Sequence, residues 1–385
     1  MIRRTHCIAS FVLFYCGLAA AVAQTWSLHG QASGWITSNP DKSPVSQAGL
    51  RYIPELTVEQ KVRGDLGADL DLSLNDYATE SFEKSQRPEY NGKIKPYRAW
   101  LRLASNSFEV RAGLQKISFG SATLFRSLMW FDRIDPRDPL QLTDGVYGLL
   151  ARYYFLSNAN IWLWGLYGNN DPKGWEIVPT KEKSIEYGGR VQTPLWTGEA
   201  GFSYHHREAD FTNLAGLPIT AGGSSVPENR FALDGKWDIG IGAWFEAVLI
   251  HEQTEFPGMK FQRQWTLGAD YTFPDVIGGN GLTVLTEYFR SEHPDDAFGP
   301  ADGLGFSGWS LNYPLGPVDR ISCILYRDWT NHDWYRLVTW QRTYDNWIIY
   351  LLGFWNPQSI QLYQTQQGSS PFAGTGIQLM VVFNH

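Results

Sequence analysis

The fold class of this chain is best judged from residues 113–148, GLQKISFGSATLFRSLMWFDRIDPRDPLQLTDGVYG. The sequence leading into this stretch alternates, with Val110 and Leu114 on one side and Arg111 and Gln115 on the other, which is typical of a β-strand. The alternation stops at Phe119-Gly120 and resumes near residue 146. The connection between these points carries large apolar residues: Leu124, Phe125, Leu128, Met129, Trp130, Phe131 and Ile134. So many apolar groups are atypical of a disordered linker, so we expect the connection to pack on another part of the protein.

Strand-like alternation continues through the rest of the sequence. The expected strands are longer than the ~5–6 residues usual in globular proteins and match the ~9–11 residues of a tilted membrane strand. We expect eighteen of them, with sixteen as the alternative. Their ranges are 25–36, 48–62, 66–75, 93–104, 107–118, 146–155, 159–168, 183–192, 199–207, 229–239, 241–252, 263–273, 281–291, 303–313, 320–329, 334–344, 347–355 and 372–384.

The connections between these strands alternate between short turns and long loops. An even number of antiparallel strands places both termini at the end with the short turns, as in bacterial outer-membrane barrels. The stretch after residue 115 is then the third long connection. The sequence therefore predicts an all-β protein, a transmembrane antiparallel β-barrel, whose third extracellular loop folds into the lumen and narrows the pore. An external loop packed on the rim is the alternative.

The first residues resemble an export signal. Arg3 and Arg4 precede an apolar run from Ile8 to Val22, and Ala21-Val22-Ala23 resembles a cleavage site. We expect residues 1–23 to be a signal peptide and residues 24–385 to form a single barrel domain. Of the three cysteines only Cys323 lies outside that leader, so an intrachain disulfide framework is excluded.

Composition narrows the function classes. The formal net charge of −7 gives no nucleic-acid signature, and outside the leader no apolar run reaches the ~18–20 residues of a membrane helix. Aromatic residues make up 15 % of the chain. These features indicate a bacterial outer-membrane protein whose partners are membrane lipids and small solutes, with no nucleic acid. Both a monomer and a trimer are open at this point.

Charged residues on the polar faces are the candidate pore lining. We expect basic side chains on three neighbouring strands to lie opposite acidic ones such as Glu246 and Glu287, because rings and stripes of charge tune which solutes pass a pore. The alternative is local ion pairing without a role in transport. The candidate lining and constriction residues are Arg98, Arg102, Arg111, Arg126, Asp132, Arg133, Asp135, Arg137, Asp138, Arg152 and Arg190.

Other chemistries have weaker sequence support. His205 and His206 are adjacent on an expected strand and would point to opposite faces, so they cannot bind one metal ion together. The Gly-x-Ser-x-Gly, phosphate-loop and dinucleotide-binding motifs are absent. We therefore expect no cofactor, no metal and no enzymatic activity. The two alternatives are a barrel enzyme acting on lipids and a secreted β-rich carbohydrate-binding protein, either a propeller or a sandwich.

Residues 110–120 (VRAGLQKISFG) and 128–139 (LMWFDRIDPRDP) resemble outer-membrane porin-like proteins, most nearly the alginate-export type of 18-stranded barrel. Those proteins often carry Arg-x-Gly-Arg-Gln, and this sequence has Leu114 at the position of the second arginine. The resemblance implies a channel for passive diffusion of small polar or charged solutes, with an anionic solute or a carbohydrate as the candidates.

Overall fold

The computed structural model describes residues 24–41, 44–83, 87–212, 225–254, 260–358 and 372–385. Within them, eighteen antiparallel strands form one sheet, and no helix is long and apolar enough to cross a membrane. The strands are β1 (Gln24–Ser38), β2 (Ser46–Arg63), β3 (Leu66–Phe82), β4 (Glu89–Ala104), β5 (Phe108–Gln115), β6 (Val146–Tyr154), β7 (Asn160–Tyr167), β8 (Ile185–Leu195), β9 (Gly198–Asp210), β10 (Ser225–Asp238), β11 (Gly242–Glu252), β12 (Phe261–Ile277), β13 (Asn280–Glu292), β14 (Gly303–Pro314), β15 (Asp319–Asp328), β16 (Trp334–Thr343), β17 (Trp347–Trp355) and β18 (Thr375–Asn384).

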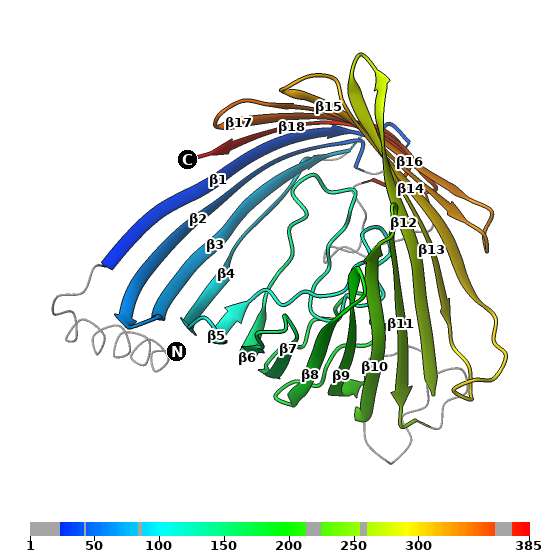
Figure 1. The fold of residues 1–385 in the computed structure, drawn as a ribbon. Helices are drawn as coiled ribbons and strands as arrows, with labels where there is room; N and C mark the ends of the chain where they lie inside the picture. Colours follow the sequence, from blue (N-terminus) through cyan, green and yellow to red (C-terminus); the bar gives the residue numbers. More distant parts are fainter. Residues whose placement is uncertain (1–23, 42–43, 84–86, 213–224, 255–259, 359–371) are drawn as a thin grey trace.

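The sheet closes on itself through its first and last strands. β1 pairs with β2 along its whole length and with β18 from Gln31 to Ser38. At the end of this seam, Gly30 and His385 exchange two backbone hydrogen bonds of 3.0 Å. Closure pairs the edges that an open sheet would expose, and Figure 1 shows the resulting ring of strands. The prediction of eighteen strands is confirmed, whereas the alternatives of a secreted propeller or sandwich are wrong.

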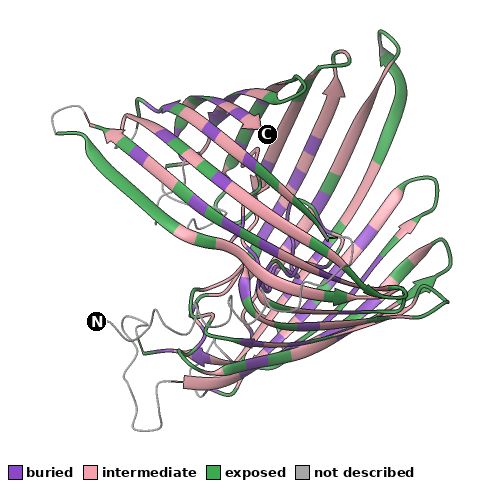
Figure 2. Ribbon diagram, turned by 90° about the vertical axis from the view of Figure 1, so that its left-hand side faces the viewer, coloured by how far each residue is buried: buried purple, intermediate pink, exposed green. Residues whose placement is uncertain are grey.

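Several strands, including β9, β11 and β16, alternate between buried and more exposed residues, as a period of two predicts. In β16, Trp334, Arg336 and Val338 are exposed while Tyr335 and Leu337 between them are buried. Figure 2 shows these alternating buried and exposed bands along the strands. The outward face carries a broad set of exposed apolar side chains: Leu149, Leu163, Val191, Phe202, Leu233, Leu267, Leu351, Ile377 and Leu379. Apolar surface on this scale is unfavourable in water and suits hydrocarbon, which indicates the bacterial outer membrane.

Short and long connections alternate around the barrel as expected. The turn between β2 and β3 occupies residues 64–65, where Gly64 has a φ of +62° that suits glycine. At the opposite end, the connections include residues 116–145 and 168–184. The start of β1 and the end of β18 both lie at the end with the short turns.

Two strand boundaries differ from the sequence prediction. β3 continues to Phe82 rather than ending near Asn75, because its backbone stays paired with β2 and β4 where the apolar alternation has stopped. β5 ends at Gln115 rather than Ser118, because its pairing with β6 ends at Val146. The predicted leader, residues 1–23, lies outside the described residues, so the division into leader and barrel domain stays a prediction.

Candidate functional site

The connection between β5 and β6, residues 116–145, is held by two carboxylates from distant strands. Glu246 on β11 accepts backbone N–H groups of Ala122 at 2.9 Å and Leu128 at 3.0 Å. Glu287 on β13 accepts three further backbone N–H groups, from residues 123, 124 and 125, at 2.6–2.8 Å. These hydrogen bonds satisfy backbone donors that no strand partner reaches, so the two carboxylates fix the path of the connection.

Apolar packing adds to these hydrogen bonds. Phe125 contacts the rings of Phe289, Phe306 and Tyr326, with ring centroids 5.0–5.9 Å apart. Leu128, Trp130 and Phe131 join a second cluster that includes Leu150 and Trp164. Phe289 is buried between Tyr288 and Arg290, so the packing surface is the inward face of the barrel wall. The expectation that this connection packs through its apolar residues is confirmed.

Four of the candidate lining residues form ion pairs within the connection. Arg126 binds Asp132 at 2.9 Å, and Arg137 binds Asp135 at 2.9 Å. Arg126, Asp132 and Arg137 are buried, and only Asp135 is partly accessible. These pairs shape the connection, and their role as a pore constriction stays a prediction.

Arg133 and Asp138 are half-buried in the same connection. The backbone N–H of Arg133 donates to Thr143 Oγ1 at 2.9 Å, and burial lowers the pKa of the Arg133 guanidinium. The Asp138 carboxylate accepts the Leu140 N–H at 3.0 Å, and burial raises the pKa of Asp138. Among the described residues, no ion pair within 4.0 Å joins Arg133 to an acid.

A basic wall lies on β4, β5 and β6, formed by Arg98, Arg102, Arg111 and Arg152. Arg102 and Arg111 are directly paired across β4 and β5. Glu109 is shared by three of these arginines, with N···O distances of 3.0 Å to Arg111, 3.7 Å to Arg152 and 3.8 Å to Arg102. Asp69 on β3 also accepts from Arg102 Nε at 2.6 Å. The structure thus brings together four of the eleven candidate residues on one wall.

Aromatic rings support the guanidinium groups of this wall. The guanidinium carbon lies 3.9 Å from the Tyr97 ring for Arg98, 4.6 Å from Trp100 for Arg111 and 3.8 Å from Trp162 for Arg152. Stacking leaves the edge of the guanidinium plane free to donate. The Nε atoms of Arg111 and Arg152 are buried and have no hydrogen-bond partner among the residues that the structure describes.

Arg51 on β2 was not among the sequence candidates. Its guanidinium lies 5.4 Å from the Trp35 ring and 5.6 Å from Tyr77, and its Nε is also without a partner. Its neighbours Leu50 and Tyr52 are exposed on the outward face, so the alternation of the strand places Arg51 on the inward face. Its alternation with those two apolar residues was the signal that could have identified it. Arg51 therefore extends the basic wall from β4–β6 to β2.

Arg190 lies on β8, where its register partner is Trp162 of β7, which is itself paired with Arg152 of the basic wall. It forms a buried double ion pair with Asp234, at 2.5 and 2.8 Å, and its guanidinium lies 5.3 Å from the Phe119 ring. Because both charges are buried and matched, Arg190 acts as a packing contact for the connection. Arg190 therefore adjoins the basic wall through Trp162, but its charge is bound to Asp234.

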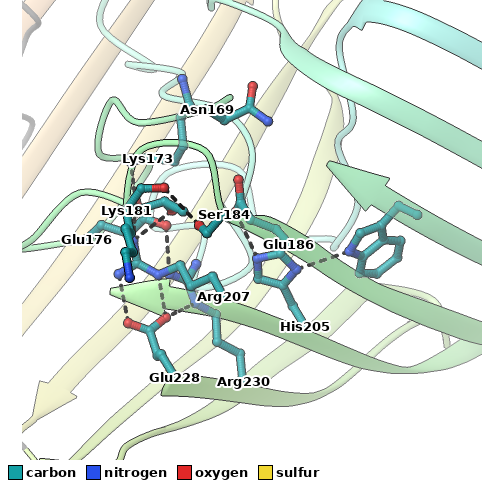
Figure 3. Close-up of polar contacts among 12 residues, drawn as sticks. Asn169, Lys173, Glu176, Lys181, Ser184, Glu186, His205, Arg207, Glu228 and Arg230 are labelled. Atoms are coloured by element: carbon teal, nitrogen blue, oxygen red, sulfur yellow. Dashed lines mark hydrogen bonds and ion pairs between the residues drawn. The ribbon is translucent and has the colours of Figure 1, made fainter. Parts of the chain in front are cut away.

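A second connection, residues 168–184, is held by a buried charge network shown in Figure 3. Arg207 pairs with Glu228 at 2.7 Å, and Arg230 joins Glu228 to Glu176 of the connection, each at 2.6 Å. Nearby, His205 lies 3.3 Å from Glu186 and accepts from the Trp164 indole at 3.1 Å. Glu176 lies 54 residues from Arg230 along the chain, so no local sequence pattern indicates that the two residues pair.

His205 and His206 point to opposite faces, as expected. His205 is fully buried beside Glu186, whereas His206 contacts Asn229 at 3.0 Å and the ring of Tyr187. The two rings therefore cannot share one ion.

Comparison with known proteins defines the fold class. No protein-family model matches the sequence, and no curated protein matches it. Among solved structures, OccD3 (OpdP) of Pseudomonas aeruginosa is similar with a TM-score of 0.58 and 10 % identity, covering 95 % of this chain and 92 % of that one. OmpT of Vibrio cholerae, an outer membrane protein described as a trimer form, is similar with a TM-score of 0.50 and 11 % identity, covering 94 % of this chain and 100 % of that one.

Identities this low establish the fold alone. The chain has the β-barrel fold of bacterial outer-membrane porins, and its apolar outer surface matches that location. The alginate-export subfamily, which the sequence resembled, is not among these structures.

The expectation of no enzymatic activity is corrected by the same comparison. The chain shares its fold with the outer membrane protein OmpT, and one fold hosts unrelated functions. The missing sequence motifs were too narrow a basis for the exclusion, because catalytic groups are recognised by their geometry rather than by sequence spacing alone. The exclusion of an enzyme therefore does not stand.

Proposed function

We propose that this protein is an outer-membrane channel for passive diffusion of small polar solutes, and that anionic solutes are favoured. The observation that carries the proposal is the basic wall, Arg51, Arg98, Arg102, Arg111 and Arg152, on the inward face of β2 and β4–β6. The guanidinium groups of Arg51, Arg98, Arg111 and Arg152 lie against aromatic rings, and the wall carries five arginines.

The anchored connection supplies the narrowing in this proposal. Residues 116–145 are bound to β11 and β13 by Glu246 and Glu287, while the basic wall lies on β2 and β4–β6. Supporting this arrangement, Figure 1 draws the connection within the curve of the strands. Arg98 itself donates to the Thr143 carbonyl of the connection at 3.0 Å. A solute would then pass between the connection and Arg102, Arg111 and Arg152, where the reduced width brings it within reach of the charges.

The contacts of the wall favour an anion over a neutral sugar. Guanidinium groups bind carboxylate, phosphate and sulfate oxygens through paired N–H donors. The ring of Trp100, which could otherwise stack on a sugar, is already covered by Arg111 at 4.6 Å. Of the two solute classes that the sequence resemblance implies, the anionic one is the class this wall would accept.

The proposal is tested by reversal potentials across a planar bilayer in a KCl gradient. For Arg111→Gln combined with Arg152→Gln, we expect the chloride-to-potassium permeability ratio to fall about fivefold, the factor corresponding to about 1 kcal/mol of charge interaction. Glu109→Gln should shift the ratio the opposite way, because it removes the acid shared by three arginines.

The matched control is Arg290→Gln, an arginine on the outward face of β13 paired with Glu292 at 2.6 Å. It should leave the ratio unchanged. An absence of current steps from folded protein, or equal ratios in all variants, would contradict the proposal. Association into trimers is part of the proposal and is measured separately by native mass spectrometry.

A further inference from the structure

The outward face of β15–β18 carries an arginine–tryptophan patch at the end of the barrel with the long connections. We define it as Arg327, Trp329, Trp334, Arg336 and Trp355. Trp334 and Arg336 are exposed on alternate positions of β16, and Trp355 is exposed at the end of β17. These side chains point away from the lumen, so they take no part in the proposed channel.

The two arginines of the patch lie close to aromatic rings. The Arg327 guanidinium is 5.6 Å from the Trp329 ring and 5.3 Å from Trp334, and that of Arg336 is 6.0 Å from Trp334. Trp334 in turn stacks on Trp309 with ring centroids 6.0 Å apart. The tryptophans thus hold both cations on one outward surface.

Neither arginine is neutralised by an acid. In the part of the chain that the structure describes, no ion pair involves Arg327 or Arg336, and Arg327 uses one N–H to bind the His332 carbonyl at 2.7 Å. On β12–β13 the outward arginines differ, because Arg263 and Arg290 both bind Glu292, at 2.7 and 2.6 Å. Within the described residues, the charges of Arg327 and Arg336 are therefore not compensated by an ion pair, whereas those of Arg263 and Arg290 are compensated by Glu292.

A shallow recess of about 470 Å³ opens beside these residues. Trp334, Arg336, Trp355 and Asn356 contribute to its lining, and Asp333 is its one acidic lining residue among those described. Further along the same strands toward the turns, the outward residues become apolar, with Val338, Leu351, Ile377 and Leu379 exposed. Cationic groups, indole rings and hydrocarbon-facing side chains thus follow one another along the membrane normal.

We propose that this patch binds the phosphate-bearing sugar headgroup of a glycolipid in the outer leaflet. The guanidinium groups would pair with phosphate oxygens, indole faces would stack on sugar rings, and the acyl chains would cover the apolar residues of β16–β18. The ligand is a lipid, because the patch is continuous with the membrane-facing surface.

The test is native mass spectrometry of the folded full-length barrel in detergent with bis-phosphorylated lipid A added. We expect Arg327→Ala combined with Arg336→Ala to weaken binding by about tenfold. The control, Arg290→Ala, lies on the outward face but is paired with Glu292, so it should bind lipid A as the parent does. Heat-modifiable gel mobility verifies that each variant is folded.

Two further probes identify what is recognised. Dephosphorylated lipid A should bind the parent protein as weakly as the double variant binds the phosphorylated form, and inorganic phosphate alone should not displace lipid A. Trp334→Leu should weaken lipid A binding without affecting bilayer ion selectivity. Equal binding by the parent and the folded double variant would overturn the proposal, as would displacement by millimolar inorganic phosphate, which would indicate a site for the free anion.

Discussion

Glu287 illustrates how one residue can determine a connection more than a hundred residues away. Its carboxylate accepts the backbone N–H groups of Thr123, Leu124 and Phe125 and the Trp244 indole at 3.0 Å. A carboxylate has several lone pairs and no donor, so it can accept all four bonds. The sequence showed Glu287 as an acid on a polar face; its role as an anchor depends on what lies opposite.

We predict that Glu287→Gln loosens the connection. The glutamine amide has one acceptor oxygen, and its NH2 group would face backbone N–H groups that also donate. Hydrogen bonds to charged groups contribute about 1.5–3 kcal/mol each, so their loss weakens the anchor. Single-channel recordings should show larger current fluctuations in the open state. Thr286→Ala, which changes the neighbouring outward-facing residue, is the control and should record as the parent does. Identical noise in both variants would show that the anchor is dispensable.

At the level of elements, the basic wall and the connection meet at β4, where Arg98 donates to the Thr143 carbonyl at 3.0 Å and Lys95 pairs with Asp144 at 2.7 Å. Regular strands place every second residue inward, so Arg102 on β4 and Arg111 on β5 are adjacent by register alone. The connection has no such regularity. Its position comes from side chains on β11–β13, including Thr266, which donates to the carbonyl of Phe125 at 2.6 Å.

A designed disulfide can test whether the connection is stationary. Ser127 Oγ and Thr266 Oγ1 are 2.8 Å apart, so cysteines at these positions can approach bonding distance. In a Cys323→Ser background, we expect Ser127→Cys with Thr266→Cys to form the bond on oxidation and leave mean conductance unchanged, because the connection is already anchored there. Conductance that changes between oxidised and reduced protein would indicate that the connection moves away from β12.

For the whole molecule, closure depends on the pairing of the first and last strands. β1 and β18 pair over residues 31–38 and 377–384. His385 extends the seam by its two backbone hydrogen bonds to Gly30, and its ring Nε2 lies 3.0 Å from Tyr52 Oη. The residue following the last strand thus belongs to the seam of the barrel.

Deleting His385 should therefore lower the temperature at which the folded band disappears in a heat-modifiable gel. Two neutral backbone hydrogen bonds contribute about 1–3 kcal/mol together, which corresponds to a shift of a few degrees. Tyr52→Phe removes only the side-chain contact and should have a smaller effect. A deletion variant as heat-stable as the parent would show that the seam is complete without this residue.

Much of the architecture was predictable from sequence because it is local. The period of two in segments such as residues 66–75, the turn at Gly64 and the alternating connection lengths follow from backbone geometry and side-chain polarity over a few neighbouring residues. The same pattern indicated the inward face, and so it identified Arg98, Arg102, Arg111 and Arg152 as neighbours.

The tertiary structure decided which charges are bound and which are free. Alternation assigns a residue to a face but does not identify its partner, so Arg190 and Arg111 were equivalent in the sequence. Arg190 is neutralised by Asp234, 44 residues away, and Glu246 reaches Ala122 across 124 residues. The first pair forms across β9 once β8, β9 and β10 are in register, and the second forms when the connection folds against β11. Both pairs are therefore determined by the three-dimensional fold.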